Sequence, residues 1–239
     1  MKGKDRIIFA LDVDNSADAL LWVARLSGRV GVFKVGLELF VSAGPSLVEQ
    51  IVGKGEKVFL DLKFHDIPAT VAGAVRSASS LGAFMINVHA LAGGDALKRA
   101  SEAVREGAAK AGKVPPKLLA VTVLTSHSQG TLDELGVKGT PAEAVERFAL
   151  LAKASGADGV VASPLEAGAI RSLWSGGLIV TPGVRPAGAG ANDQNRIATP
   201  AGAVKAGADY LVIGRPIRSA EEPRLAAGEI ALEIDGILA

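Results

Sequence analysis

Short runs of apolar, mostly β-branched residues recur along this chain, and helix-length segments separate them. The runs follow one another at intervals of roughly 25 to 30 residues, as expected for repeated strand–helix units. The predicted strands are Ile7–Leu11, Val32–Val35, Val58–Leu62, Phe84–Val88, Leu118–Val123, Gly159–Ala162, Leu178–Thr181 and Tyr210–Ile213. Segments rich in Ala and Leu predict helices between them, among them Ala17–Leu26, Pro45–Val52, Ala69–Ser80, Asp95–Ala111, Pro141–Ser155 and Leu165–Leu173. Several of these helices open on a proline or on a capping residue such as Ser16.

The predicted strands are apolar almost throughout, which indicates a parallel sheet covered by helices on both faces. Eight such units closed on themselves make a (β/α)8 TIM barrel, a fold of about 250 residues. An open doubly wound sheet is the alternative, but it favours a glycine fingerprint after the first strand, where this chain has Asp12-Val13-Asp14-Asn15-Ser16. No change in composition divides the chain. We therefore expect residues 1–239 to form one α/β domain, a single (β/α)8 barrel.

The composition excludes several classes of protein. Lys and Arg total 26 against 25 for Asp and Glu, so no basic surface for nucleic acid is indicated. The chain has no cysteine, which excludes disulfides and thiolate metal sites and fits a reducing compartment. Asp12 and Asp14 interrupt the first apolar run, which therefore predicts a strand and not a signal peptide. No run approaches the roughly 20 apolar residues that cross a bilayer. We expect a cytoplasmic protein that binds neither nucleic acid nor membrane.

Charged residues are concentrated at the end of the third predicted strand. Asp61 and Lys63 are two residues apart, so in a regular extended strand their side chains share a face. Asp66 lies just past the strand, where Ile67-Pro68 leads into the next element. Charges on an apolar strand are costly to bury unless they pair with one another. This pattern indicates a site at which the chain carries out chemistry.

Polar residues also end most of the other predicted strands. They are Asp12 on the first, Lys34 on the second, Asn87 and His89 on the fourth, Thr125 and Ser126 on the fifth, Thr181 on the seventh, and Gly214 with Arg215 on the eighth. The carboxyl ends of the strands carry the active site in TIM barrels. Singly, each residue has an ordinary alternative: Asp12 can cap a helix, and Lys34 can extend to the rim. Together with the charged residues at the end of the third strand, Asp12 and Lys34 predict one site of paired charges. Ion pairing with a purely structural role is the alternative.

Alternating charges of this kind favour a particular reaction. Lys63, expected between Asp61 and Asp66, should stay protonated and could act as a general acid that quenches a carbanion. The carboxylates would repel a substrate carboxylate by on the order of 4 kcal/mol at ~4 Å and an effective dielectric constant near 20. Relief of that repulsion in the transition state corresponds to roughly three powers of ten in rate. These alternating carboxylates and ammonium groups suit a reaction in which CO2 is lost and a proton is then delivered to the carbon.

A phosphate site is predicted at the end of the eighth strand. Gly214 exposes a backbone N–H, and Arg215 adds a forked cation. TIM barrels often bind phosphate with the loops after the seventh and eighth strands, and Gly183 and Arg185 lie in the first of these loops.

The segment 184–199, rich in Gly, Ala, Pro and Asn, is predicted to be a lid loop. Its Gln194 could bridge phosphate and base through the side-chain amide, although a solvated glutamine is the alternative. Thr125 and Ser126 offer donors and acceptors suited to a pyrimidine edge, with a capping role as the alternative. The three histidines, His65, His89 and His127, lack metal-ligand spacing; we interpret His65 as structural and His89 as a support behind the site.

The chain resembles the orotidine 5′-phosphate decarboxylase family over essentially its full length. The matching segments are ALDVD around Asp12, FKVGLELF around Lys34, DLKFHDIPAT across 61–70, VTVLTS ending at Ser126, TPGVRP at 181–186 and VIGRPI at 212–217. The D-x-K-x-x-D core alone marks only the wider superfamily. Its combination with Lys34 and the two later motifs is specific to the family.

This resemblance implies a (β/α)8 barrel that converts orotidine 5′-monophosphate (OMP) to uridine 5′-monophosphate (UMP) and CO2 in de novo pyrimidine biosynthesis, without a metal or an organic cofactor. It implies that Lys63 protonates C6 of the pyrimidine and that Asp61 lies beside the departing carboxylate. Lys34 would hold Asp61 and the ribose, and Asp12 would contact the ribose hydroxyls.

The resemblance also implies a homodimer in which Asp66, Ile67 and Thr70 reach into the partner's site. The remaining implied contacts are Thr125 and Ser126 to the base, and Arg185, Gln194, Gly214 and Arg215 to the phosphate.

Two other functions are compatible with parts of the pattern. The superfamily relatives 3-keto-L-gulonate 6-phosphate decarboxylase and hexulose-6-phosphate synthase share the D-x-K-x-x-D motif but use magnesium, bound partly through a Glu where this chain has Lys34. The ammonium groups of Lys34 and Lys63 would repel that ion. A barrel that binds a nucleotide without converting it is the other alternative. Binding alone, however, does not require a general acid and paired carboxylates in addition to the phosphate-binding residues.

Overall fold

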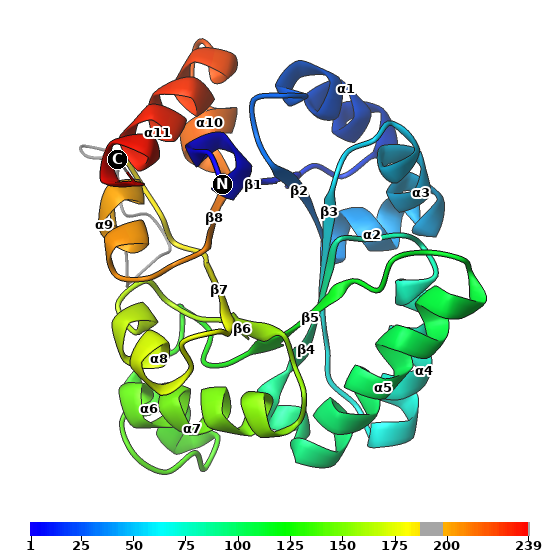
Figure 1. The fold of residues 1–239 in the computed structure, drawn as a ribbon, viewed down its shortest axis with the longest axis vertical. Coiled ribbons are helices and arrows are strands. Elements are labelled where there is room, and N and C mark those ends of the chain that lie inside the picture. Colours follow the sequence, from blue (N-terminus) through cyan, green and yellow to red (C-terminus); the bar gives the residue numbers. More distant parts are fainter. Residues whose placement is uncertain (187–197, 239) are drawn as a thin grey trace.

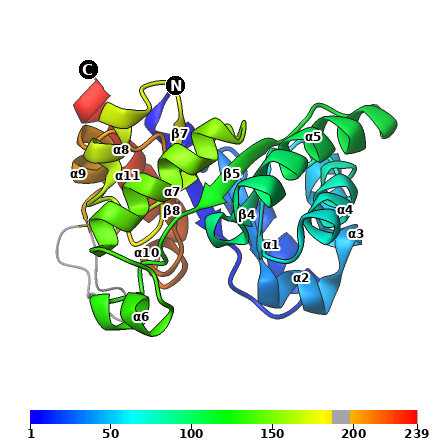
Figure 2. The same cartoon turned by 90° about the horizontal axis from the view of Figure 1, so that it is seen from below.

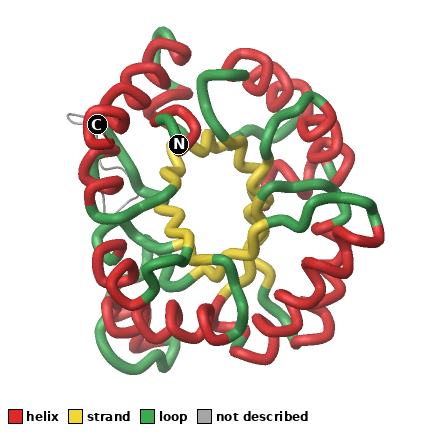
Figure 3. The backbone as a smooth tube through the Cα atoms, in the orientation of Figure 1, coloured by secondary structure: helices red, strands yellow, loops and turns green. Residues whose placement is uncertain are grey.

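Parallel strands close into a barrel in which the strand order follows the sequence from β1 to β8, and β1 pairs with β8 to complete the ring (Figures 1 and 3). The computed structural model describes residues 1–186 and 198–238. The strands are β1 (Ile7–Ala10), β2 (Val32–Gly36), β3 (Val58–Phe64), β4 (Met85–His89), β5 (Lys117–Val121), β6 (Gly159–Val161), β7 (Leu178–Thr181) and β8 (Tyr210–Ile213). The predicted (β/α)8 barrel is therefore confirmed.

Helices surround this ring of strands on every side (Figure 1). They are α1 (Ser16–Leu26), α2 (Leu37–Ala43), α3 (Pro45–Gly53), α4 (Pro68–Ser79), α5 (Gly94–Lys110), α6 (Gln129–Glu134), α7 (Pro141–Ala154), α8 (Ala167–Leu173), α9 (Pro200–Lys205), α10 (Arg215–Arg218) and α11 (Pro223–Leu238), with 3-10 turns η1 (Gly3–Arg6) and η2 (Ala90–Ala92). The prolines that open α3, α4 and α7 occupy the first turn, where their missing N–H is not needed. Ser16 is not the cap of α1; the Asn15 side chain accepts the Asp18 N–H instead. None of the helices in the described part is long and apolar enough to cross a membrane.

The apolar residues form two layers, one outside and one inside the ring. Ile7 and Phe9 of β1 belong to the large cluster between strands and helices, whereas Ile8 belongs to a smaller one. The smaller cluster consists of Ile8, Val32, Phe59, Met85, Leu119, Val180 and Tyr210. Phe59 also lines the cavity described below, so the smaller cluster closes the barrel beneath that cavity.

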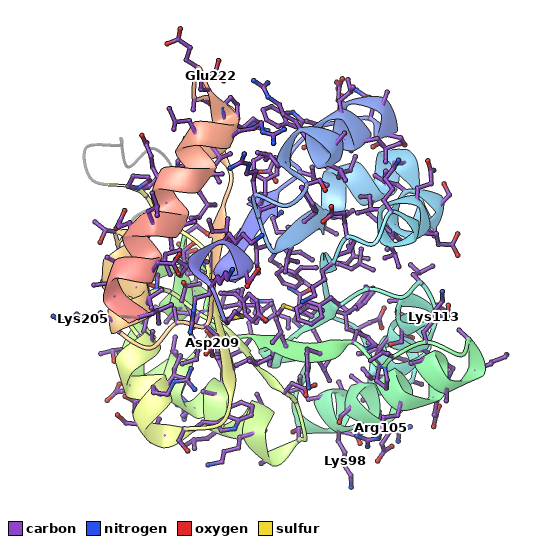
Figure 4. The ribbon with its side chains drawn as sticks, turned by 45° about the horizontal axis from the view of Figure 1, so that its top comes forward. Lys98, Arg105, Lys113, Lys205, Asp209 and Glu222 are labelled. Atoms are coloured by element: carbon purple, nitrogen blue, oxygen red, sulfur yellow. The ribbon has the colours of Figure 1, made fainter. Side chains whose placement is uncertain are left out.

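The two ends of the barrel differ. In Figure 2, α2 and α6, the short helices after β2 and β5, lie opposite both chain termini. The connections that follow the carboxyl ends of the strands therefore occupy the end away from the termini. Charged side chains such as Lys98, Lys113 and Lys205 point outward from the periphery (Figure 4).

The third strand departs from regular geometry near its end. Leu60 pairs with Ile86 and Phe64 pairs with Val88, so four residue steps on β3 oppose two on β4. Lys63 lies within this irregularity with φ 49°, the only positive φ outside glycine in the described part of the chain. The expectation that Asp61 and Lys63 meet through regular strand alternation is therefore wrong in its geometry, although the two side chains do meet.

Candidate active site

A cavity of about 370 Å³ lies at the carboxyl ends of the strands. Its size falls in the range typical of small-molecule sites. Its polar lining comes from loops and strand ends distant in sequence: Asp12, Lys34, Asp61, Lys63, Thr125, Ser126, Gly183, Arg185, Gly214 and Arg215. Its apolar wall includes Ala10, Phe59, Val121, Val161 and Val212. The structure thus brings most of the residues predicted for the site into one cavity.

Four of the lining residues form a row of alternating charges. Lys34 Nζ lies 3.3 Å from Asp12 Oδ1 and 3.6 Å from Asp61 Oδ2. Lys63 Nζ lies 2.7 Å from Asp61 Oδ1. The Lys34 and Asp61 side chains are each only 12% exposed, whereas that of Asp12 is half-exposed. The opposite charges offset one another at the buried centre of the row, as the sequence predicted.

Asp61 is the centre of this row, and it is held in its ionised form. Burial disfavours its charge and is the largest single influence on its pKa. The charges of Lys34 and Lys63 and hydrogen bonds from Lys63 and Asn87 together outweigh burial, so the pKa of Asp61 lies below its usual value. A permanent negative charge is therefore fixed beside the Lys63 ammonium.

Asn87 of β4 is a further residue of this network. Its Oδ1 accepts the backbone N–H of Lys63 at 2.8 Å, and its Nδ2 donates to Asp61 Oδ1 at 2.7 Å. From the sequence, Asn87 was placed among the polar residues at strand ends but was assigned no role. Its position near the end of the strand that follows the charged strand was the one sequence feature that could have indicated its role.

Asp66, Ile67 and Thr70 do not line the cavity of their own chain. All three are exposed, and Ile67 retains 67% of its accessible surface. The Asp66 Oδ1 accepts the N–H of Ile67 at 2.6 Å. The ion pairs of the described residues join Lys63 to Asp61 and not to Asp66. Within one chain, the expected placement of Lys63 between the two carboxylates is therefore wrong, because Asp66 lies past the strand on the outer surface.

The predicted phosphate residues Arg185, Gly214 and Arg215 line the same cavity as the charged row. Arg185 is only 6% exposed, and its backbone N–H donates to Ala198 O at 3.0 Å, which joins the two described ends of the segment 184–199. A Cβ added to Gly214 would lie 3.3 Å from both Ala10 Cβ and Asp12 Oδ2, so glycine permits this close approach to β1. Gln194 and most of the predicted lid, residues 187–197, lie outside the described residues.

None of the three histidines is among the described residues that line the cavity. The rings of His65 and His89 stack with their centroids 5.5 Å apart. Burial, followed by the charges of His65, His127 and Lys63, lowers the pKa of His89 to about 4, so its imidazole is neutral at neutral pH. Its Nδ1 accepts the Leu91 N–H at 3.3 Å. These contacts agree with the structural roles expected for His65 and His89.

The described residues contain no group of three or more His, Asp or Glu side chains placed to hold a metal ion. The carboxylate at the centre of the site, Asp61, is instead occupied on both oxygens by ammonium groups. A divalent cation would meet two positive charges there.

The fold and this site define a TIM-barrel enzyme whose cavity pairs a buried carboxylate–ammonium row with arginines suited to an anionic group. The chain belongs to the orotidine 5′-phosphate decarboxylase / HUMPS family, whose model matches residues 5–230.

Curated relatives and a solved structure agree with this assignment over nearly the whole chain. The chain is 56% identical to an orotidine 5′-phosphate decarboxylase of Halorhodospira halophila, over 97% of this chain and 97% of the relative. It is 55% identical to one of Trichlorobacter lovleyi, over 98% and 96% of the two chains. The crystal structure of orotidine 5′-phosphate decarboxylase from Lactobacillus acidophilus matches with a TM-score of 0.86 at 40% identity, covering 96% of this chain and 98% of that one.

Proposed function

We infer that this protein acts as a decarboxylase in which Lys63 is the proton donor. The reaction is the decarboxylation of OMP to UMP and CO2 in pyrimidine biosynthesis. The observation that carries the mechanism is the Asp61–Lys63 pair, 2.7 Å apart at the wall of the cavity. The structure does not favour the magnesium-dependent alternative, because Lys34 Nζ, 3.6 Å from Asp61 Oδ2, adds a cation where that alternative would need a metal ligand.

The proposed reaction begins with repulsion between the substrate carboxylate and ionised Asp61. The bond from C6 to the carboxylate carbon breaks, CO2 leaves, and the electron pair stays on C6. Lys63 Nζ then transfers a proton to C6, which forms the C–H bond of UMP and leaves a neutral amine that solvent reprotonates. Stabilisation of the developing carbanion by the ammonium and relief of the repulsion both lower the barrier.

The other lining residues are proposed to bind the nucleotide. Asp12 and Lys34 would contact the ribose, and Thr125 with Ser126 would meet the base. The phosphate ligands would be Arg185, Gln194, Gly214 and Arg215. We propose a cytoplasmic enzyme that needs no organic cofactor or metal and has no nucleic-acid or membrane partner.

The purified protein should decarboxylate OMP in a spectrophotometric assay, and its rate should be unchanged in excess EDTA. The reason is that the proposed group that stabilises and protonates C6 is the Lys63 ammonium and not a metal ion. Loss of activity in EDTA that magnesium restores would favour the metal-dependent alternative. Binding of UMP without turnover of OMP would favour the non-catalytic one.

We further propose that the protein works as a homodimer whose sites are shared between chains. The exposure of Asp66, Ile67 and Thr70 next to the carboxyl end of β3 supports this proposal. In the dimer Asp66 would approach the partner's Lys63, and Ile67 and Thr70 would complete the wall of the partner's cavity.

Mixing inactive Lys63→Ala chains with inactive Asp66→Ala chains should restore activity. A hybrid dimer has one intact site, so equal mixing with full exchange should recover about a quarter of the native activity. A mixture of Lys63→Ala with Asp61→Asn chains is the matched control. Both residues belong to the same chain's cavity, so that mixture should recover nothing. No recovery in the first mixture, with exchange shown by differently tagged chains, would mean that each site belongs to one chain.

A further inference from the structure

Asn87 connects two charged residues of β3 from the neighbouring strand. It is 0% exposed and lies near the end of β4. One end of its amide accepts from the Lys63 backbone at 2.8 Å, and the other end donates to the Asp61 carboxylate at 2.7 Å. One side chain thus contacts both members of the pair that the proposed mechanism uses.

The Lys63 backbone needs such a support. Its φ of 49° is in the left-handed region, which is disfavoured for a residue with a Cβ and persists where the surroundings impose it. The regular ladder between β3 and β4 is interrupted from Leu60 to Phe64, so the strand pairing does not by itself supply a partner for the Lys63 N–H. The Asn87 oxygen supplies that acceptor.

An amide is the chemical group that this position requires. The Lys63 N–H needs an acceptor, and the ionised Asp61 oxygen needs a donor. An asparagine provides both in one planar group, and the two partners determine which way the amide faces. A leucine has a similar shape with neither function, and an ionised aspartate accepts but cannot donate.

We infer that Asn87 is a positioning residue for the decarboxylation: it holds the Lys63 main chain in its left-handed conformation and orients the Asp61 carboxylate, so that Lys63 Nζ points at the reacting carbon. This inference rests on the proposed role of Lys63 as proton donor. Asn87 does not line the cavity and acts through the two residues it contacts.

Asn87→Leu should lower kcat for OMP by about 10²-fold, because a small displacement of a reacting group has an effect of that size. KM should change by no more than about threefold, since the residues proposed to bind ribose, base and phosphate keep their places. Thr122→Val is the matched control. Thr122 is also 0% exposed, and its hydroxyl donates to Val161 O at 3.0 Å without touching the charged row. The control should retain kcat within about threefold of the native value.

Asn87→Asp provides a test that a merely structural role would not satisfy. When its carboxyl is protonated, it can donate to Asp61 and accept from Lys63, as the amide does. When ionised, it opposes the Asp61 charge. The charged residues that contact it are Asp61 and Lys63 of β3. Lys34 of β2 pairs with the same Asp61, and the β5 residue paired with position 87 is the uncharged Leu119. The kcat deficit relative to the native protein should therefore shrink as the pH falls from about 8 to about 5, and at the lower pH this variant should exceed Asn87→Leu.

Steady-state kinetics of the three variants and the native protein decide the matter, with UMP binding as a check that each variant folds. The inference is overturned if Asn87→Leu keeps kcat within about threefold of native, or if Asn87→Asp is as impaired as a folded Asn87→Leu at every pH. Should Asn87→Leu fail to fold, the pH dependence of Asn87→Asp decides alone. Lys63→Ala in the same assay separates the two proposals. If this variant has native kcat, the proposed role of Lys63 as proton donor fails. If Lys63→Ala is inactive but the Asn87 variants keep native kcat, only the positioning role of Asn87 is refuted.

Discussion

Lys63→Ala is expected to lower kcat for OMP by about 10⁴-fold or more while UMP affinity stays within about tenfold of the native value. The ammonium lies 2.7 Å from Asp61 and is the proposed source of the proton at C6. Among the described residues that line the cavity, the other lysine, Lys34, is directed to Asp12 and Asp61 and does not replace the lost acid. UMP lacks the departing carboxylate, so its binding depends on the ribose, base and phosphate contacts. Single-turnover kinetics with OMP and calorimetric titration with UMP measure the two effects.

Lys63→Arg is the matched variant for this prediction. Arginine keeps a positive charge beside Asp61 but does not release a proton at neutral pH, so it should be nearly as inactive as the alanine variant. Lys117→Ala is the control for loss of a lysine ion pair elsewhere, since Lys117 pairs with Asp158 at 3.0 Å and is half-exposed. Native turnover in Lys63→Ala, or high activity in Lys63→Arg, would contradict the role of proton donor.

Asp61→Asn is expected to lower kcat by about 10³-fold. The substitution keeps the shape of the side chain but removes a charge whose repulsion of the substrate carboxylate is on the order of 4 kcal/mol at ~4 Å. It also leaves Lys34 and Lys63 without the carboxylate between them. UMP should bind about as well as it binds to the native protein, because the product carries no carboxylate for Asp61 to repel. The measurement is kcat for OMP alongside the dissociation constant of UMP.

Glu106→Gln is the matched control for Asp61→Asn. Glu106 forms an ion pair of 2.8 Å with Arg76, and it is 58% exposed on the outer helices. Its loss should leave kcat unchanged, since exposed pairs contribute little to stability and this one is remote from the cavity. A fall in UMP affinity as large as the fall in kcat for Asp61→Asn would assign Asp61 to binding instead of to the chemical step.

The fold was predictable because most positions of the strands are apolar and buried, whichever face they point to. Runs such as Ile7–Ala10 and Tyr210–Ile213 are apolar throughout, and the prolines at 45, 68 and 141 mark where helices begin. The convergence of Asp12, Lys34 and Asp61 followed from the barrel itself, since the carboxyl ends of all strands meet at one mouth.

Other features depended on contacts between strands that the sequence does not display. The left-handed backbone of Lys63 arises where β3 and β4 lose register, and the amide that supports it comes from residue 87, far along the chain. The outward position of Asp66 likewise follows from how the chain turns from β3 into α4, and it separates this carboxylate from the Lys63 of its own chain.

By itself the sequence determined the barrel, the alternation of charges and the family, because periodic apolar runs and residue types are local properties of the chain. Only the tertiary structure decided the direction of Lys63, the part taken by Asn87 and the surface placement of Asp66. The physical reason is that these features result from hydrogen bonds and register between neighbouring strands. The energies of those interactions depend on distances between residues of different segments, which the sequence of one segment does not determine.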